Sequence, residues 1–237
     1  MSASRLAPSK ADTVRAMFTR IARRYDLMNS LMTAGLHHAW RRRVAASVAG
    51  VPGGPVLDLA TGTADLAIAV RARTPGRFVA GADFSEGMLQ VAQAKLRQRG
   101  VAHVELLAAD ALALPFRDGA FACVMSAFLL RNLEDLKRGL AEMRRVTARG
   151  GRVVTLDIVR PAQPLWGAVF GAYFSRVVPA IGAFVAGDRQ AYTYLPQSVD
   201  RFVTPDELAE LMEDVGLRDV SYRRLGLGTI ALHVGIA

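Results

Sequence analysis

Apolar and polar residues alternate along the chain with two different periodicities. Between residues 55 and 151, short apolar runs alternate with longer segments whose apolar residues recur every three or four positions. This succession predicts βαβ units and a parallel sheet. Five strands are predicted, over residues 56–60, 77–83, 104–109, 121–127 and 152–159. The intervening helices are expected over residues 65–73, 86–99 with Ser85 as the cap, and 136–146. Gly150 and Gly151 are expected to break the chain before the fifth strand.

The C-terminal part continues this pattern with one helix and two strands. Thr204, Pro205 and Glu207 form a capping box with proline at the first helical position, so a helix is expected to begin there. Two alternating runs, 220–224 and 229–234, predict a terminal hairpin. The fold class is therefore α/β and Rossmann-like, with a seven-stranded, mostly parallel sheet, a C-terminal antiparallel hairpin and helices on both faces.

Two segments lie outside this core. We expect a helical extension over residues 1–50 before the α/β domain of residues 51–237, and a helical insertion at about 162–203. Within the insertion, the apolar segment 164–187 is nearly long enough to span a bilayer. Arg176 interrupts it, and a central arginine costs about 2.5 to 3.5 kcal/mol on insertion scales. A helical lid or interfacial segment is therefore predicted, with ordinary core packing as the alternative.

The composition, 51% hydrophobic and 22% charged, is that of a soluble globular chain. Arginine supplies 27 of the 30 basic side chains, and the formal charge is +9. This excess suggests an anionic partner: nucleic acid, an anionic membrane surface or an anionic ligand. Only 7% of residues are aromatic and no zinc-ligand spacing occurs, which argues against nucleic acid. The single cysteine, Cys123, is expected to be buried and inert, and the N-terminus lacks the apolar core of a secretory signal, so a cytoplasmic location is expected.

A loop of small residues follows the first strand. Residues 58–65 read Asp-Leu-Ala-Thr-Gly-Thr-Ala-Asp. Such a turn lets backbone N–H groups approach a ligand at the carboxyl edge of an α/β sheet. Ala60 and Ala64 stand where glycines are usual, which leaves only Gly62. The two alanines must therefore avoid positive φ or accept strain.

Acidic side chains stand at the ends of three successive strands, at Asp58, Asp83 and Asp110. Asp83 is placed to accept hydrogen bonds from both hydroxyls of a ribose. Asp110 can accept from an adenine amino group while the N–H of Ala111 donates to the ring. Carboxylates suit a cationic sulfonium ligand better than a pyrophosphate. The alternative is that these acids are helix caps or loop residues.

More specific motifs complete the pattern, and the sequence resembles the class I S-adenosylmethionine-dependent methyltransferases, in particular the ubiquinone/menaquinone biosynthesis C-methyltransferase family. The motifs that carry the resemblance are Tyr25-Asp26-Leu27-Met28-Asn29 with His37, His38 and Trp40, Leu114-Pro115-Phe116, Leu130-Arg131-Asn132, Arg145-Val146 with Gly150-Gly151-Arg152, Pro179-Ala180-Ile181-Gly182, and Ala231-Leu232-His233. They extend from about residue 10 to the end. The chain departs from the family pattern at Ala127, Leu129 and Asp157, where serine, glycine and glutamate are usual.

The resemblance implies C-methylation of a prenylated quinol, with demethylmenaquinol to menaquinol as the leading case. A 2-polyprenyl-6-methoxy-1,4-benzoquinol, or another aromatic or lipid acceptor, is the alternative. The cofactor implied is S-adenosyl-L-methionine. The residues expected to bind it are Gly62, Thr63, Asp83, Asp110, Ala111 and Ser126.

Methylation at carbon is favoured when the neighbouring phenol ionises. Moving a phenol pKa from about 10 to about 7 requires about 4 kcal/mol. Arg131 can contribute much of this through a charge-assisted contact in a dry pocket, but it cannot be the base itself. We expect Arg131 to stabilise the phenolate while Asn132 and Tyr25 orient the ring. His37 and His38 are rival bases, or packing residues.

A prenyl tail holds the quinol in the bilayer, at about 0.8 kcal/mol per buried CH₂ group. We therefore expect peripheral contact at the inner face of the membrane. The segment 164–187 would form a lid or tail channel, and the basic N-terminal helices would meet anionic lipid at about 1 kcal/mol per arginine. No metal and no nucleic-acid partner are predicted, and the oligomeric state is left open, with a homodimer among the options. A nucleic-acid methyltransferase and a non-catalytic cofactor-binding module are the competing readings.

Overall fold

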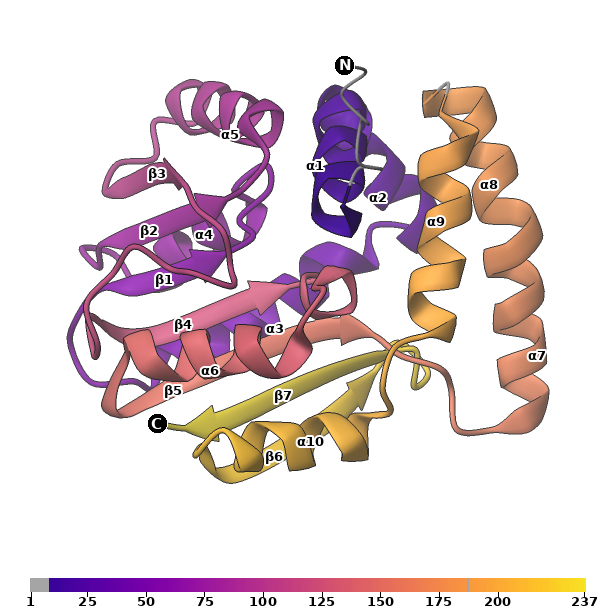
Figure 1. The fold of residues 1–237 in the computed structure, drawn as a ribbon. Helices are drawn as coiled ribbons and strands as arrows, with labels where there is room; N and C mark the ends of the chain where they lie inside the picture. The colour runs from indigo at the N-terminus through magenta and orange to yellow at the C-terminus, as the bar shows by residue number, and fades with distance from the viewer. Residues whose placement is uncertain (1–8, 187) are drawn as a thin grey trace, which may run out of the picture.

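The computed structural model describes residues 9–186 and 188–237. Its centre is one seven-stranded sheet with the strand order β3-β2-β1-β4-β5-β7-β6 (Figure 1). Every pairing from β3 to β5 is parallel, and β7 is antiparallel to both β5 and β6. The strands are β1 (Val56–Leu59), β2 (Val79–Asp83), β3 (Val104–Ala108), β4 (Phe121–Ala127), β5 (Thr147–Ile158), β6 (Arg218–Leu225) and β7 (Ile230–Ile236). The predicted sheet is confirmed.

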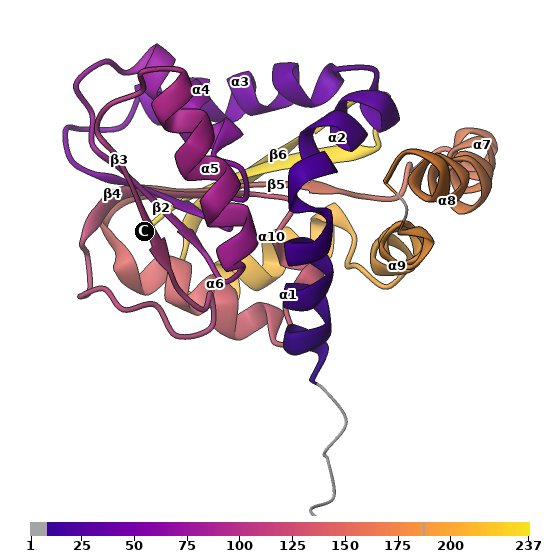
Figure 2. The same ribbon diagram turned by 90° about the horizontal axis from the view of Figure 1, so that it is seen from above.

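Helices cover both faces of the sheet (Figure 2). One face is covered by α3 (Leu36–Ala49), α4 (Asp65–Arg73) and α5 (Glu86–Gln98), and the other by α6 (Leu136–Val146) and α10 (Pro205–Asp214). The predicted caps are present: the Ser85 side chain accepts from Met88 N, and Thr204 and Glu207 form a capping box. Trp40 and other residues of α3 pack into the core of the α/β domain. The predicted division of the chain at residue 50 stays a prediction.

The predicted break before the fifth strand is wrong. Strand β5 begins at Thr147 and continues through Gly150 and Gly151. On β4, Phe121 pairs with Thr147 while Cys123 pairs with Arg152, so the extra residues of β5 form a bulge. Gly150 adopts a φ of +76°, which glycine accepts readily, and the bulge therefore absorbs these residues without ending the strand.

The loop after β1 is held in a left-handed conformation. Ala60, Gly62 and Ala64 have φ values of +56°, +55° and +66°. The two alanines therefore accept the strain, which costs about 1 kcal/mol or more for each L-residue. Backbone bonds fix this turn, since Thr61 N donates to Ala82 O and Ala64 N donates to Thr61 O, both at 2.9 Å.

Two helical groups lie beyond the carboxyl ends of the parallel strands (Figures 1 and 2). The N-terminal group is α1 (Lys10–Ile21), η1 (Ala22–Arg24) and α2 (Tyr25–Thr33). The second group, called the hairpin below, comprises α7 (Pro164–Ala172), η3 (Tyr173–Val177), α8 (Val178–Ile181), η4 (Gly182–Ala186) and the returning α9 (Arg189–Asp200). An apolar cluster joins the two groups. In it, Met17 and Met28 of the N-terminal group pack beside Val178 and Tyr192 of the hairpin.

The first arm of the hairpin is long and apolar enough to cross a membrane. It spans Pro164–Val185, 22 residues with a mean hydropathy of 1.5, and 17% of its most apolar window is buried. Residue 187, at the end of the predicted apolar segment, lies outside the described residues. Tyr173 fixes the arm to α2, since its hydroxyl donates to Met32 O at 2.9 Å. The segment is helical and contacts α2 at this point, and its role as a lid or interfacial segment stays a prediction.

Candidate active site

Two cavities meet at the carboxyl end of the sheet. The first, about 370 Å³, lies over the ends of β1 to β4 and is called the cofactor cavity. The second, about 490 Å³, lies between α2, the end of β4 and the hairpin and is called the acceptor cavity. The residues that line both are Phe18, Tyr25, Phe128 and Asn132. Molecules bound in the two cavities would therefore lie next to each other beside these four side chains.

Gly62 and Asp83 form the floor of the cofactor cavity. Gly62 N donates to Asp83 Oδ2 at 2.8 Å, and Ser85 N donates to Asp83 Oδ1 at 2.8 Å. Burial of Asp83 raises its carboxyl pKa above the ordinary value, although these N–H donors oppose the shift. A Cβ atom at Gly62 would lie 4.0 Å from the ring of Tyr25, so the loop and α2 face each other closely.

The far end of the cofactor cavity contains Asp110 and Ala111. Leu112 N donates to Asp110 Oδ1 at 2.9 Å, and the carboxylate remains exposed. Helix α1 covers this cavity with residues that the sequence analysis missed, namely Ala11, Val14, Arg15 and Phe18. Lys10 Nζ donates to Leu133 O at 2.7 Å and so ties α1 to the chain after β4. Helical periodicity alone does not distinguish a cavity lining from a core contact.

Three residues that the sequence singled out at the cofactor loop and strand ends line neither cavity. The hydroxyl of Thr63 donates to Asp26 Oδ1 at 2.6 Å. Ser126 is buried inside β4. Asp58 Oδ2 accepts from Thr61 Oγ1 at 2.7 Å and from Ala67 N at 3.0 Å, which makes it an anchor of the loop and of α4. Burial raises the Asp58 pKa to about 7. The cofactor-binding roles of Thr63 and Ser126 stay predictions.

The cofactor cavity fits an adenosine cofactor that carries a positive charge. Each oxygen of Asp83 accepts one backbone N–H and keeps a further lone pair for a ribose hydroxyl. The charged residues that line this cavity are Asp83, Glu86, Asp110, Glu134 and one base, Arg15. An acidic lining of this kind favours a sulfonium over a pyrophosphate.

Arg131 and Asn132 project from η2 (Leu130–Asn132), directly after β4. Arg131 Nη1 donates to Asp157 Oδ1 at 2.5 Å and to Phe128 O at 3.0 Å. The guanidinium carbon lies 5.7 Å from the centroid of the Phe128 ring. Asn132 Nδ2 also donates to Phe128 O, at 3.0 Å, and its Oδ1 accepts from the Tyr194 hydroxyl at 3.2 Å. The Arg131 guanidinium and the Asn132 amide are thus held in fixed orientations at the acceptor cavity.

The departures from the family pattern are accommodated locally. Leu129 stands where glycine was expected, and its φ of −91° suits a side chain. The left-handed conformation falls instead on Phe128, with a φ of +66°. Asp157, which replaces the expected glutamate, is buried and forms the ion pair with Arg131. The end of β4 therefore keeps a sharp turn without the glycine.

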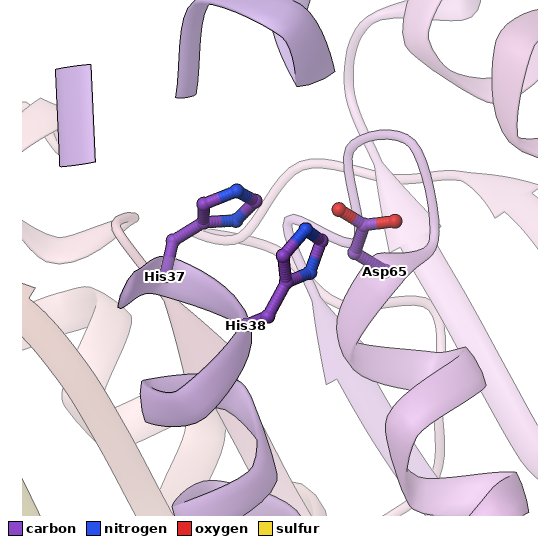
Figure 3. Close-up of side chains that lie close together, drawn as sticks. All are labelled: His37, His38 and Asp65. Carbon is purple, nitrogen blue, oxygen red and sulfur yellow. The ribbon is translucent and has the colours of Figure 1, made fainter. Parts of the chain in front are cut away.

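His37, His38 and Asp65 lie close enough to hold a metal ion, with ligand atoms within 4.8 Å of one another (Figure 3). Two cations already occupy this group, because Asp65 pairs with Lys95 at 2.7 Å and with Arg41 at 3.3 Å. Arg41 also contacts His37 Nδ1. Burial, with Arg41 and His38 nearby, lowers the His37 pKa to about 4. We read the cluster as an ion network that joins α3, α4 and α5.

Lys95 extends this network to the acceptor side. Its Nζ lies 2.5 Å from Asp26 Oδ2, and Asp26 in turn accepts from Thr63. Asp26 directly follows Tyr25, which lines both cavities. The network therefore fixes the start of α2, and with it Tyr25, against the cofactor loop.

The acceptor cavity also contains residues that sequence reasoning missed. They are Asn29, Trp166, Tyr192 and Tyr194. Tyr192 and Tyr194 stand two positions apart in a helix, a spacing that places them on different sides of it. No local pattern distinguishes them from packing residues.

Comparison with known proteins identifies the family. A model of the ubiE/COQ5 methyltransferase family matches residues 6–237. A demethylmenaquinone methyltransferase of Thermus thermophilus is 45% identical over 219 residues, which are 92% of this chain and 99% of that protein. A ubiquinone/menaquinone biosynthesis C-methyltransferase UbiE of Desulfotalea psychrophila is 42% identical over 229 residues, which are 96% of this chain and 92% of that protein.

Solved structures confirm the fold. A SAM dependent methyltransferase of Aquifex aeolicus has a TM-score of 0.63 at 17% identity, over 90% of this chain and 98% of that one. The [4+2]-cyclase SpnF has a TM-score of 0.68 at 20% identity, over 94% of this chain and 78% of that one. The predicted fold class, methyltransferase activity and S-adenosyl-L-methionine cofactor are confirmed by these matches together with the family. The chain is an S-adenosyl-L-methionine-dependent methyltransferase that belongs to the ubiE/COQ5 methyltransferase family.

Proposed function

We propose that this enzyme transfers a methyl group to a ring carbon of a prenylated quinol, with demethylmenaquinol as the acceptor. The observation that carries the proposal is the contact between the two cavities at Tyr25, Phe128 and Asn132, with Arg131 on the acceptor side. A ring in the acceptor cavity would lie next to the methyl donor with its oxygen near a cation. Relatives named demethylmenaquinone methyltransferase, such as those of Thermus thermophilus and Deinococcus radiodurans, support this acceptor.

A benzoquinol is the second candidate. Relatives of Desulfotalea psychrophila and Methylobacterium nodulans, 42% and 38% identical, are named ubiquinone/menaquinone biosynthesis C-methyltransferases. The same cavity and the same cation would serve a methoxylated benzoquinol.

Four residues would hold the cofactor. Asp83 would accept from the ribose hydroxyls, Asp110 and the N–H of Ala111 would bind the adenine, and Gly62 allows close approach of the loop. When bound, S-adenosyl-L-methionine supplies an electrophilic methyl group. Methyl transfer then needs alignment of donor and acceptor, which Tyr25 and Asn132 provide by orienting the ring.

Arg131 stabilises the phenolate oxygen next to the carbon that is methylated. Its guanidinium is nearly enclosed, so a charge-assisted contact there is stronger than in water. His37 is a poor proton acceptor because its pKa is lowered to about 4. We therefore assign the phenolic proton to water rather than to His37.

The mouth of the acceptor cavity supports peripheral contact with the inner face of the membrane. Leu31, Leu36, Val169 and Leu227 line this cavity and are exposed. Leu165 on α7, which precedes the lining residue Trp166, is 82% exposed. Arg23 and Arg24 on η1 are also exposed, and their charges suit anionic headgroups. A quinol whose tail stays in the bilayer could enter through this apolar mouth.

Labelled S-adenosyl-L-methionine tests the proposal. The purified enzyme is incubated with reduced demethylmenaquinone, with a reduced demethylated benzoquinone and with RNA, and the labelled product is identified. We expect carbon-bound label on the naphthoquinol. Label on the benzoquinol alone supports the second candidate. Label on RNA, or cofactor binding without turnover, contradicts both quinol acceptors. Light scattering separately distinguishes a monomer from a homodimer.

A further inference from the structure

Hydrogen-bond donors without partners gather in the acceptor cavity. Among the described residues, seven buried polar side-chain atoms lack a hydrogen-bond partner. Four of them belong to residues that line this cavity, and all four can donate: Asn29 Nδ2, Arg131 Nε, Trp166 Nε1 and Tyr192 Oη. Buried donors are almost always satisfied in folded proteins. This group therefore indicates a ligand with accepting oxygens at more than one place.

Tyr192 is tightly packed. It is 3% exposed and lies in the cluster that joins the hairpin to the N-terminal helices. A Cβ atom at Gly182 would lie 2.3 Å from the Tyr192 ring, so the ring fills the space that the missing side chain leaves. The phenol is thereby wedged between η4 and α9, and its hydroxyl cannot swing out to solvent to find a partner.

The Tyr192 hydroxyl remains a donor at neutral pH. Burial raises its pKa above the ordinary value, and Tyr25 and Asp188 add to the shift. Tyr25, which borders both cavities, packs against the same apolar cluster as Tyr192. Tyr192 itself lines only the acceptor cavity.

We propose that the Tyr192 hydroxyl donates a hydrogen bond to the second oxygen of the quinol, para to the oxygen held by Arg131. This inference rests on the proposed quinol acceptor. A 1,4-quinol carries oxygens at opposite ends of its ring, and Arg131 and Asn132 take the end beside the cofactor. Tyr192 takes the other end, so the enzyme selects acceptors with two oxygens and fixes which ring carbon meets the methyl group.

The test combines one variant with one altered acceptor. Tyr192→Phe removes only the hydroxyl, and a 3-prenyl-1-naphthol lacks only the second oxygen of a short-chain demethylmenaquinol. For the diol, we expect kcat/KM to fall about 10-fold in Tyr192→Phe, as for the loss of one hydrogen bond. For the mono-ol, wild type and variant should agree within about twofold.

Tyr173→Phe is the matched control. The Tyr173 hydroxyl lies at the same cavity but already donates to Met32 O, so its loss should affect both acceptors equally. Thermal unfolding should show Tyr192→Phe at least as stable as the wild type, because the hydroxyl has no partner to lose. An equal loss for both acceptors, or no loss for either, overturns the role of Tyr192.

A binding measurement separates this inference from the proposed function. If the wild type methylates neither acceptor, the proposed function is wrong. Tyr192 is then tested by calorimetric titration with oxidised short-chain demethylmenaquinone, because binding of this molecule needs no turnover. A roughly 10-fold weaker Kd in Tyr192→Phe supports the hydrogen bond. Equal binding, or no binding to either protein, overturns it.

Discussion

Arg131 Nη1 lies 2.5 Å from Asp157 Oδ1, and the two side chains are only 7% and 2% exposed. Removing the carboxylate would leave a buried guanidinium without a counter-charge, which is strongly destabilising. We expect Asp157→Asn to lower the free energy of unfolding by about 3 kcal/mol, measured by urea denaturation. The control is Asp214→Asn, because the Lys137–Asp214 pair is 59% and 58% exposed and is worth less than about 1 kcal/mol. Equal losses in the two variants would contradict a special role for the buried pair.

Arg131→Lys tests the cation itself. Lysine keeps the charge but loses the planar guanidinium whose Nη1 donates to both Asp157 and Phe128 O. We expect kcat/KM to fall about 10-fold to 100-fold, with unchanged cofactor affinity, in assays with labelled S-adenosyl-L-methionine. Arg42→Lys, at an exposed position of α3, is the control. A kcat/KM for Arg131→Lys that matches the wild type at every pH would remove the proposed role.

Asp83→Ala tests the ribose contact. Hydrogen bonds to a buried carboxylate are worth about 1.5 to 3 kcal/mol, so we expect a Kd about 10-fold to 100-fold weaker. Calorimetry with S-adenosylhomocysteine measures it, because that molecule keeps the adenosine. Asp110→Ala provides the comparison, since the exposed Asp110 carboxylate should contribute less. A larger loss at Asp110 than at Asp83 would reverse the assignment.

Asp58 predicts a pH dependence of stability. Its pKa is raised from 3.8 to about 7 in the folded protein, so between these values the folded state holds a proton that the unfolded state releases. Stability from this group therefore falls as pH rises from about 4 to about 7, by up to about 4 kcal/mol. His37 acts with the opposite sign, because its pKa is lowered to about 4 and stability is lost as pH falls through that range.

The difference between wild type and Asp58→Asn isolates the Asp58 contribution, since His37 is present in both. We expect the variant to gain stability relative to the wild type as pH rises from 4 to 7, measured by urea denaturation at each pH. A difference that does not change with pH would show that Asp58 is ionised throughout.

Leu165→Ser tests the membrane face. Leu165 is 82% exposed and does not line the acceptor cavity, so its change should weaken binding to vesicles without altering turnover of a short-chain, detergent-soluble quinol. Flotation with anionic and neutral vesicles measures both the apolar and the electrostatic contribution to membrane binding. Equal binding of the wild type to the two kinds of vesicle would remove the electrostatic part. Unchanged flotation of Leu165→Ser would remove this part of the apolar contact.

The sheet could be predicted because its strands are short apolar runs separated by segments with helical periodicity. Both the strands and the helices are therefore recognisable from the local pattern of apolar residues. The capping box at Thr204 and the cap at Ser85 were likewise visible in three or four residues. The bulge at Gly150 and Gly151 was not, because the same glycines that end a strand also permit a strand to continue around extra residues. Only the partner strand decides between the two outcomes.

The candidate site divides in the same way. Asp83, Asp110 and Arg131 stand at strand ends, where topology places side chains at a common edge. Tyr192 reaches the acceptor cavity only because the hairpin folds back over α2, a long-range contact that periodicity does not encode. Asp58 looked like its neighbouring strand-end acids, but its carboxylate accepts from Ala67 N of α4 and from the Thr61 hydroxyl, and it does not line the cavity.

The two cavities open onto different surroundings. Exposed charged residues, Arg15 and Glu134, border the cofactor cavity, whereas exposed leucines border the acceptor cavity. If the enzyme docks on the membrane as proposed, spent cofactor would be exchanged with the aqueous phase while the quinol product would diffuse sideways into the lipid leaflet. A single docked enzyme would then carry out successive turnovers on one vesicle without returning to bulk solution, and its rate would follow the surface density of quinol in the membrane rather than the total amount in the sample.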